Sequence, residues 1–187
     1  GAFGFTTTNA GQHVGYQGRP LACRLADNKE LLAYCEVLKE LNRGTIEVAL
    51  TNDVSRVSAS ERELLDLLLT ASGRPVTWLA LLNRDDDEHA TQNTLTEVSD
   101  LIARGGIPQS TCRPFIIQID LRTPFIFANM ECWNPVLNRD VAEQKKILQS
   151  DNFRTAFKEA LKRPLIFSSR WEAMTILEVQ NKSLEHL

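Results

Sequence analysis

The sequence lacks the features that mark several classes of protein. Its longest apolar runs, such as Leu79–Leu82, are far too short to cross a bilayer, and no basic-then-apolar signal segment opens the chain. Basic residues are not in excess, because 21 Lys and Arg are interspersed with 24 Asp and Glu for a net charge of −3. We therefore expect neither a membrane nor a nucleic acid as a partner.

Cysteine and histidine are also scarce. The four cysteines form no Cys-x-x-Cys pair and are widely scattered, at Cys23, Cys35, Cys112 and Cys132. This usage predicts free thiols in a reducing, cytoplasmic compartment. The chain also contains no P-loop, no GxGxxG, no GxSxG and no HExxH motif. No single motif in it therefore identifies a reaction.

What the sequence does have is an alternation of short apolar runs with amphipathic helical stretches. Strands are predicted at residues 3–7, 45–50, 76–82 and 115–120, with a short further strand at 164–167. Helices are predicted between these strands and at 139–149 and 151–162. Such alternation with short connections requires parallel strands and right-handed crossovers. The residues alone leave open a doubly wound sheet or a TIM-type barrel.

Local signals set the expected element boundaries. Asp27-x-x-Glu30 and Ser60-x-x-Glu63 read as capping boxes that begin two helices, and Asn42–Gly44 and Ser72–Gly73 end them. The acidic run Asp85–Glu88 favours the start of a third helix. The nearly continuous apolar run 76–82 predicts a strand buried on both faces.

Three residues are candidates for binding a substrate. Thr7 lies in a threonine run after the first strand, where hydroxyls can bind a carboxylate, although β-branched residues also simply suit strands. His13 follows in the loop at the carboxyl end of that strand, where parallel sheets place their sites, and the alternative is a histidine bonded to backbone. Arg122 follows the fourth predicted strand and can clamp a carboxylate, the alternative being an ion pair with Asp120.

Other candidate groups favour structural interpretations. His89 lies among acidic residues and is expected on the solvated surface, and Cys112 is expected to be a buried thiol. The glycine-rich stretch 9–15 offers a phosphate loop but does not open directly onto a helix. On these grounds alone the sequence predicts a soluble parallel α/β domain and no particular reaction.

Several stretches, in collinear order, resemble the N-acyl-D-amino-acid deacylases of the amidohydrolase superfamily. Gly1–Thr8 is similar to that family's "GAxGFSTS" strand end, and His13 and Gly18-Arg19-Pro20 follow at a similar spacing. Gly73–Trp78 resembles the family's "GRPVTF" entry to a strand. Further similar stretches are Asp27–Leu32, Asp140–Leu161 and Arg170–Leu184.

The resemblance implies an α/β fold that is a partial TIM-type (β/α) barrel of about four to five βα units with parallel strands. Residues 1–187 would then form a single partial domain, from the central and later strands of the barrel and truncated at both ends. The implied function is that of a metal-dependent hydrolase of non-peptide C–N bonds, acting on N-acyl-D-amino acids or cyclic amides. Thr7, His13 and Arg122 would be substrate-side groups.

The implied cofactor is zinc in the parent enzyme, held by an HxH pair on the first barrel strand and an Asp on the last. Neither segment is in this chain, so no residue of it is predicted to bind metal. Where the deacylases carry further metal histidines, this chain has Ala49, Leu50 and Leu79–Leu81. A non-catalytic α/β binding or oligomerisation module therefore stays open as the alternative. We also expect the isolated chain to be inactive and to self-associate through exposed strand edges, one of them the strand that begins at Gly1.

Overall fold

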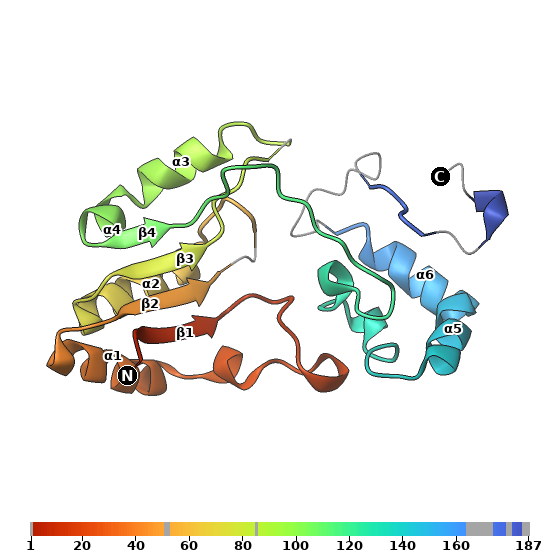
Figure 1. Cartoon of the computed structure of the whole chain (residues 1–187), viewed down its shortest axis with the longest axis horizontal. Helices are drawn as coiled ribbons and strands as arrows, with labels where there is room; N and C mark the ends of the chain where they lie inside the picture. The colour runs from red at the N-terminus through yellow and green to blue at the C-terminus, as the bar shows by residue number, and fades with distance from the viewer. Residues whose placement is uncertain (1, 51–52, 85, 164–173, 179–180, 185–187) are drawn as a thin grey trace.

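The computed structural model describes residues 2–50, 53–84, 86–163, 174–178 and 181–184. These residues form two regions, which are side by side in Figure 1. Residues 4–108 carry the strands and the first four helices and are called the βα region below. Residues 125–161 contain only helices and turns and are called the helical region.

A four-stranded parallel sheet is the centre of the βα region. Its strands are β1 (Gly4–Thr8), β2 (Thr45–Ala49), β3 (Val76–Leu79) and β4 (Gly106–Pro108). They pair in the order β1-β2-β3-β4, so each strand lies beside the one that precedes it in the chain. The parallel α/β fold with successive βα units is therefore confirmed, and β1 is an edge strand as expected.

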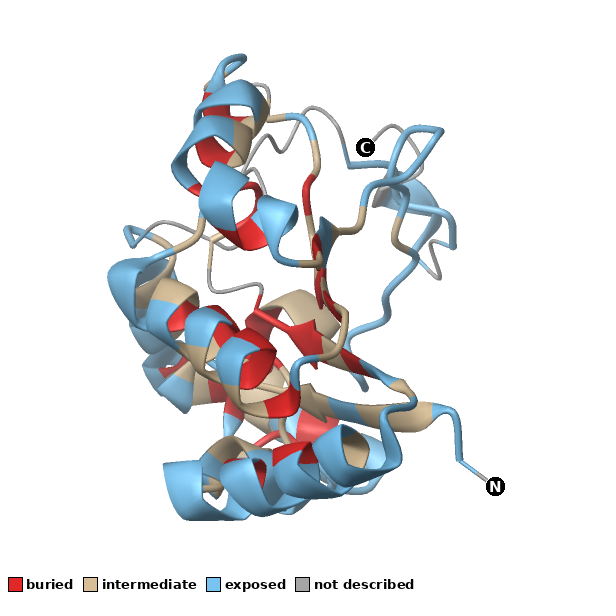
Figure 2. Ribbon diagram, turned by 90° about the vertical axis from the view of Figure 1, so that its left-hand side faces the viewer, coloured by how far each residue is buried: buried red, intermediate tan, exposed pale blue. Residues whose placement is uncertain are grey.

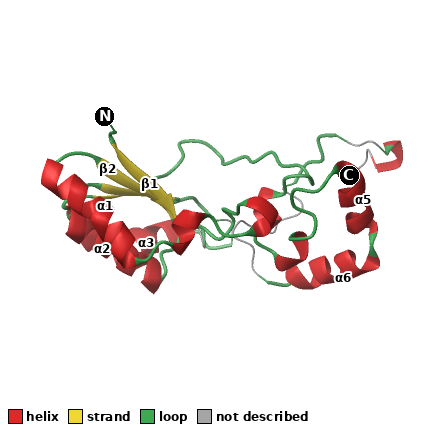
Figure 3. Ribbon diagram, turned by 90° about the horizontal axis from the view of Figure 1, so that it is seen from below, coloured by secondary structure: helices red, strands yellow, loops and turns green. Residues whose placement is uncertain are grey.

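The helices of this region all cover one face of the sheet, as Figure 3 shows for α1, α2 and α3. They are α1 (Asn28–Leu41), α2 (Ala59–Ser72), α3 (Ala90–Glu97) and α4 (Ser99–Ala103). Between them and the sheet lies a buried core, drawn red in Figure 2. Its largest members come from the two central strands, α2 and α4: Ile46, Val48, Val76, Trp78, Leu65, Leu68 and Leu101.

Most helix boundaries follow the local signals. The Asp27 carboxylate accepts the backbone N–H of Glu30 (2.9 Å) at the start of α1, and Asn42 ends that helix in the left-handed conformation. Gly73 ends α2 in the same way, with φ of 61°.

The start of α2 differs from the prediction by two residues. The cap is Ser58, not Ser60, and its partner in the capping box is Glu61, not Glu63. Both pairs have the same S-x-x-E spacing, so the local pattern does not distinguish them. The three-dimensional structure does, because Ser58 and Glu61 make both bonds of the box and the Glu61 side chain is buried, whereas Glu63 is exposed.

The prediction of a long third strand with two buried faces is wrong. β3 stops at Leu79, and its burial alternates: Val76 and Trp78 face the helices and are buried, whereas Thr77 and Leu79 on the other face are half-exposed. The helices among the described residues cover one side of the sheet, so apolar residues along this strand do not all find a partner surface there.

The fourth strand also differs from the prediction. The third helical stretch breaks at Val98 into α3 and α4, and β4 follows immediately at Gly106. Residues 115–119, predicted as a strand, have no regular structure, and Ile116 is 88% exposed. β4 occupies the available edge of β3, so the later segment has no strand partner there. The further strand predicted at 164–167 lies outside the described residues.

The helical region contains α5 (Val141–Gln149) and α6 (Asp151–Ala160), as predicted, after two short 3-10 turns. Its own core is an aromatic cluster made of Phe127, Trp133, Phe153 and Phe157. No helix in the described part of the chain combines the length and the apolar character needed to span a membrane.

Candidate functional site

The loop after β1 forms the first part of the candidate site. The backbone N–H of Asn9 donates to the carbonyl of Ala49 (2.8 Å), which ties the loop to the carboxyl end of β2. The Thr8 hydroxyl oxygen accepts the N–H of Ala10 (3.1 Å) and lies 2.7 Å from Nδ1 of His13. A hydroxyl that already accepts one hydrogen bond still has its proton to donate, so Thr8 can donate to a neutral His13.

The Arg24 side chain is hydrogen-bonded to the backbone of this loop. Its Nη1 donates to the carbonyl oxygens of Gly11 (3.1 Å) and His13 (3.3 Å). Burial lowers the pKa of His13, and the nearby Arg24 guanidinium lowers it further. The imidazole is therefore neutral near pH 7 and can exchange a proton or a hydrogen bond with a ligand. On its other side the ring packs against Phe125, with ring centroids 6.0 Å apart.

Thr7 lies one residue from this contact but on the other face of the sheet. Side chains alternate along a strand, and Thr7 is in register with the buried, helix-facing Val48. It lines a cavity of about 200 Å³ together with Thr8 and Arg24. The structure therefore brings two predicted groups, Thr7 and His13, to the same end of the same strand, although Thr8 is the threonine that contacts His13.

Arg122, the third predicted residue, lies elsewhere. It is exposed in a turn of the segment that joins the two regions. The Asp120 carboxylate accepts the backbone N–H groups of Thr123 (2.9 Å) and Arg122 (2.7 Å), and these bonds are the main reason that its pKa is lowered. Asp120 is thus a turn former, and Arg122 makes no contact with Thr7 or His13 in the described structure.

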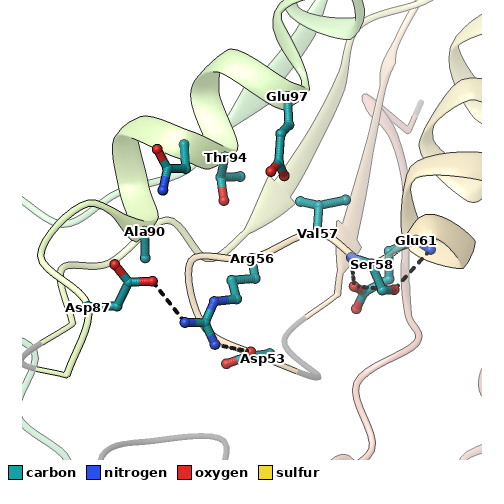
Figure 4. Close-up of a pocket in the computed structure, with 10 residues that line it drawn as sticks. Asp53, Arg56, Val57, Ser58, Glu61, Asp87, Ala90, Thr94 and Glu97 are labelled. Carbon is teal, nitrogen blue, oxygen red and sulfur yellow. Dashed lines mark hydrogen bonds and ion pairs between the residues drawn. The ribbon is translucent and has the colours of Figure 1, made fainter.

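A larger cavity of about 390 Å³ lies between the loops that follow β2 and β3 (Figure 4). Arg56 crosses its mouth, donating to Asp53 (2.9 Å) and to Asp87 (2.8 Å). The hydrogen bond from Arg56 is the main reason that the pKa of Asp87 is lowered. Arg84 pairs in turn with Asp53 and with Asp86, 2.7 Å away. These ion pairs tie the two loops to each other.

Glu61, another of the acidic residues labelled in Figure 4, is also engaged. It is 1% exposed and accepts the N–H (2.8 Å) and the hydroxyl (2.7 Å) of Ser58. The acidic residues Asp53, Asp87 and Glu61 therefore have structural partners, and this cavity is built to brace the carboxyl-end loops.

The uncovered face of the sheet carries a polar row. Thr6, Glu47 and Thr77 are in register on adjacent strands. The side-chain amide of Gln109 donates to Thr77 Oγ1 (2.9 Å) and to Glu47 Oε1 (3.3 Å). Figure 3 shows no helix on this side of the sheet within the described residues. The row is thus a polar network that faces away from the helical layer of the βα region.

The described residues do not bring three His, Cys, Asp or Glu side chains together as a metal site would require. At the ends of β2 and β3, Ala49, Leu50 and Leu81 are buried. These side chains have no atom that can bind zinc, so the residues present do not fit a zinc site.

Several residues of the site were not predicted from the sequence, notably Arg24, Arg56 and Gln109. Arg24 and Arg56 are single arginines in loops, and their partners are set by how the loops fold. Gln109 follows β4, and the sequence predicted the fourth strand seven or more residues further along the chain. A polar residue directly after a short apolar stretch such as 106–108 is the signal that would have indicated Gln109. His89, by contrast, is on the surface as predicted, with 76% of its side chain exposed.

Comparisons with known proteins add no relative. No protein family, no curated protein and no solved structure matches this chain.

Proposed function

We propose that this chain is a section of the catalytic barrel of a metal-dependent hydrolase that cleaves amide bonds outside peptides, in N-acyl-D-amino acids or cyclic amides. The observation that carries the proposal is the way the sheet is wound. Its four parallel strands follow chain order, and α1–α3 lie on one side of it (Figure 3). A doubly wound sheet reverses its strand order and carries helices on both faces, whereas a barrel continues in one direction with an outer ring of helices.

The uncovered face supports the same proposal. In a barrel it would be the interior, and Thr6, Glu47 and Thr77 would point there together with Gln109. Barrel enzymes carry their active sites at the carboxyl ends of the strands. The Thr8–His13 pair lies at that end of β1. The collinear resemblance of the sequence to the deacylases favours amide hydrolysis among the many reactions that barrels support.

This chain would contribute substrate-side groups and not the metal ligands. Thr7 would donate a hydroxyl hydrogen bond to a substrate carboxylate, and the neutral imidazole of His13 would orient the substrate by a hydrogen bond. Arg122 would reach a carboxylate bidentately. Zinc would activate water in the parent enzyme, held by residues outside this chain.

The test is an assay of the full-length protein that contains this chain. We expect turnover of N-acyl-D-amino acids that is lost on chelation and restored by zinc. His13→Ala should lower kcat/KM by roughly 10- to 100-fold, the effect of losing one hydrogen bond to a charged group. His89→Ala, on the exposed surface, is the matched control and should leave the rate unchanged. A zinc-independent enzyme, or one with no amidase turnover, would refute the proposal.

The isolated 187 residues should show no hydrolase activity with any added divalent metal. Catalytic zinc takes about three protein ligands, and the described residues contain no group that supplies them. Chelator-sensitive turnover of an N-acyl-D-amino acid by the isolated chain would contradict this assignment of the ligands to other segments.

A second candidate function is a non-catalytic binding or oligomerisation module. Two observations favour it: Ala49, Leu50 and Leu81 stand where metal ligands would be needed, and the described sheet ends at β1 and β4 while Phe115 and Ile116 expose apolar surface. Such edges and patches promote self-association. Sedimentation of the isolated chain should show dimers or larger species, and a monodisperse monomer would count against the module. Stoichiometric zinc with amidase turnover in the full-length protein would exclude it.

A further inference from the structure

The smaller cavity, of about 200 Å³, lies where β1 ends and α1 begins. Its apolar floor consists of Leu31, Val48 and Leu64, which belong to α1, β2 and α2. Its polar wall comes from the end of β1 and from the segment before α1: Thr7, Thr8, Asn9, Cys23, Arg24 and Asn28. The cavity is therefore fixed by three elements of the βα core and bordered by a loop.

Thr8 and Nη1 of Arg24 have hydrogen-bond partners, but other polar groups of this wall do not. The side chains of Thr7, Asn9 and Asn28 have no hydrogen-bond partner among the described residues. Nε of Arg24 is buried and also has no acceptor within the described part of the chain, whereas Nη1 of the same side chain has two. A buried N–H without an acceptor costs free energy that an acceptor ligand would recover. The side chains of Thr7, Asn9 and Asn28 can donate or accept, whereas Nε–H of Arg24 can only donate, so an acceptor is what the buried group of this wall lacks.

The charge of the wall selects the kind of acceptor. Arg24 is the single charged residue among those that line the cavity. Asp27, the nearest acid in the chain, does not line it and accepts the N–H of Glu30 instead. One guanidinium balances one carboxylate, whereas a phosphate carries a charge of about −1.5 to −2 at pH 7.

We propose that this cavity is a subsite for a small monocarboxylate, with Arg24 and Thr7 as its donors. The cavity is smaller than the roughly 300–1,000 Å³ of sites that enclose a whole ligand, so it takes the carboxylate end of a molecule and leaves the remainder outside. That the carboxylate belongs to an N-acyl amino acid rests on the proposed function. The preference for a monocarboxylate does not.

The chain contains its own reporter for this subsite. Cys23 lines the cavity and is exposed, so alkylating reagents reach its thiol. Iodoacetate and iodoacetamide both alkylate a thiolate with loss of iodide, and they differ in that only the first carries a carboxylate. Cys112 is a matched internal control, because it is also exposed and lies beside Arg113 but outside the cavity. General attraction of an anion to a surface arginine is therefore present at both thiols.

The experiment alkylates the intact chain with each reagent and follows the reaction by mass spectrometry of its peptides. The quantity compared is the ratio of the alkylation rate with iodoacetate to that with iodoacetamide at each thiol. We expect the ratio at Cys23 to exceed that at Cys112 by about tenfold or more, the effect of one hydrogen bond to a charged group. Acetate should suppress the excess, and acetamide should not. Equal ratios at the two thiols would overturn the proposal. So would stronger suppression by inorganic phosphate than by acetate, which would assign the cavity to phosphate.

Three variants connect the effect to the named donors. Thr7→Val removes the hydroxyl but keeps a β-branched strand residue, and Arg24→Lys keeps the charge but removes Nε–H. Each should bring the ratio at Cys23 down toward that at Cys112. Arg19→Gln, in the same loop but outside the cavity, should leave it unchanged. If Thr7→Val keeps the full ratio, or Arg19→Gln loses it, the subsite is refuted.

The outcome separates this subsite from the proposed function. If the cavity prefers iodoacetate but the full-length protein has no amidase turnover, the subsite proposal stands and the hydrolase proposal fails. If the protein has amidase turnover but the ratios at Cys23 and Cys112 are equal, the hydrolase proposal stands and the subsite proposal fails.

Discussion

The βα region and the helical region build their cores from different materials. In the βα region aliphatic side chains from a sheet and its helices interlock, with Trp78 as the one fully buried ring. In the helical region four aromatic rings pack on one another with centroids 5.0 to 5.8 Å apart. A segment of 37 residues without a sheet has little surface to bury, and large rings supply the most apolar area per residue.

The two regions touch through the loop after β1. The N–H of Gln17 donates to Oδ1 of Asn138 (2.7 Å), and His13 packs on Phe125. Gly18 adopts a φ of 74° there, and a side chain at this position would collide with Asn134. The regions are thus joined at a small contact and not by a shared core. We infer that they open independently, as separate cooperative units.

The largest expected effect tests this independence. Trp133→Ala removes the central ring of the aromatic cluster and should destabilise the helical region by about 3–5 kcal/mol. Hydrogen exchange should then be fast throughout α5 and α6 while the amides of β2 and β3 remain protected. Equal loss of protection in β2 and β3 would show that the two regions form one cooperative unit.

The corresponding substitution in the βα region should destabilise that whole region. Leu65→Ala, at a position with no exposed area, should lower the free energy of unfolding of the βα region by about 2–5 kcal/mol in urea. Leu41→Ala removes the same atoms from a side chain that is 63% exposed at the end of α1. This control should change the free energy by no more than about 0.5 kcal/mol, and similar losses in both variants would contradict the burial described above.

A smaller effect distinguishes the two possible starts of α2. Ser58→Ala removes the hydroxyl that accepts the N–H of Glu61 and should cost about 1 kcal/mol. Ser60→Ala removes an exposed hydroxyl inside the first turn of the helix and should be nearly neutral. Thermal melts of both variants give the comparison, and the reverse order would restore the start predicted from the sequence.

The smallest effect concerns His13, which lies between the two regions. Its pKa is lowered in the folded chain by burial and then by Arg24. The folded state therefore binds fewer protons than the unfolded state. The neutral His13 thus contributes to the free energy of unfolding in full above the ordinary histidine pKa of about 6.5, and this contribution declines as the pH falls through the pKa of the folded state. An NMR titration should place the midpoint of His13 below that ordinary value. Arg24→Gln should raise the midpoint, and an unchanged or lower midpoint would contradict the second cause.

Much of the secondary structure of both regions could be predicted from the sequence. The strands at β1 and β2, the helices α1, α5 and α6, and the caps at Asp27 and Gly73 all follow from signals within about four residues of each boundary. The order of short strands and helices then required parallel pairing, which the sheet has. His13 was placed correctly at the end of β1, because the loop after a parallel strand always lies at that edge.

The tertiary structure decided the features that depend on contact with a distant part of the same chain. The segment 115–120 has strand-forming residues, but β4 is the strand that pairs with β3, and the segment pairs with none of the described strands. Cys112, predicted to be buried, is exposed for the same reason, because the segment that it precedes is not in the sheet. Thr77 and Leu79 are half-exposed since the helices that the structure describes cover the opposite face. The cavity at Thr7 and Arg24 likewise arises where a strand end, a loop and a helix start meet, and no local pattern in the sequence contains that meeting.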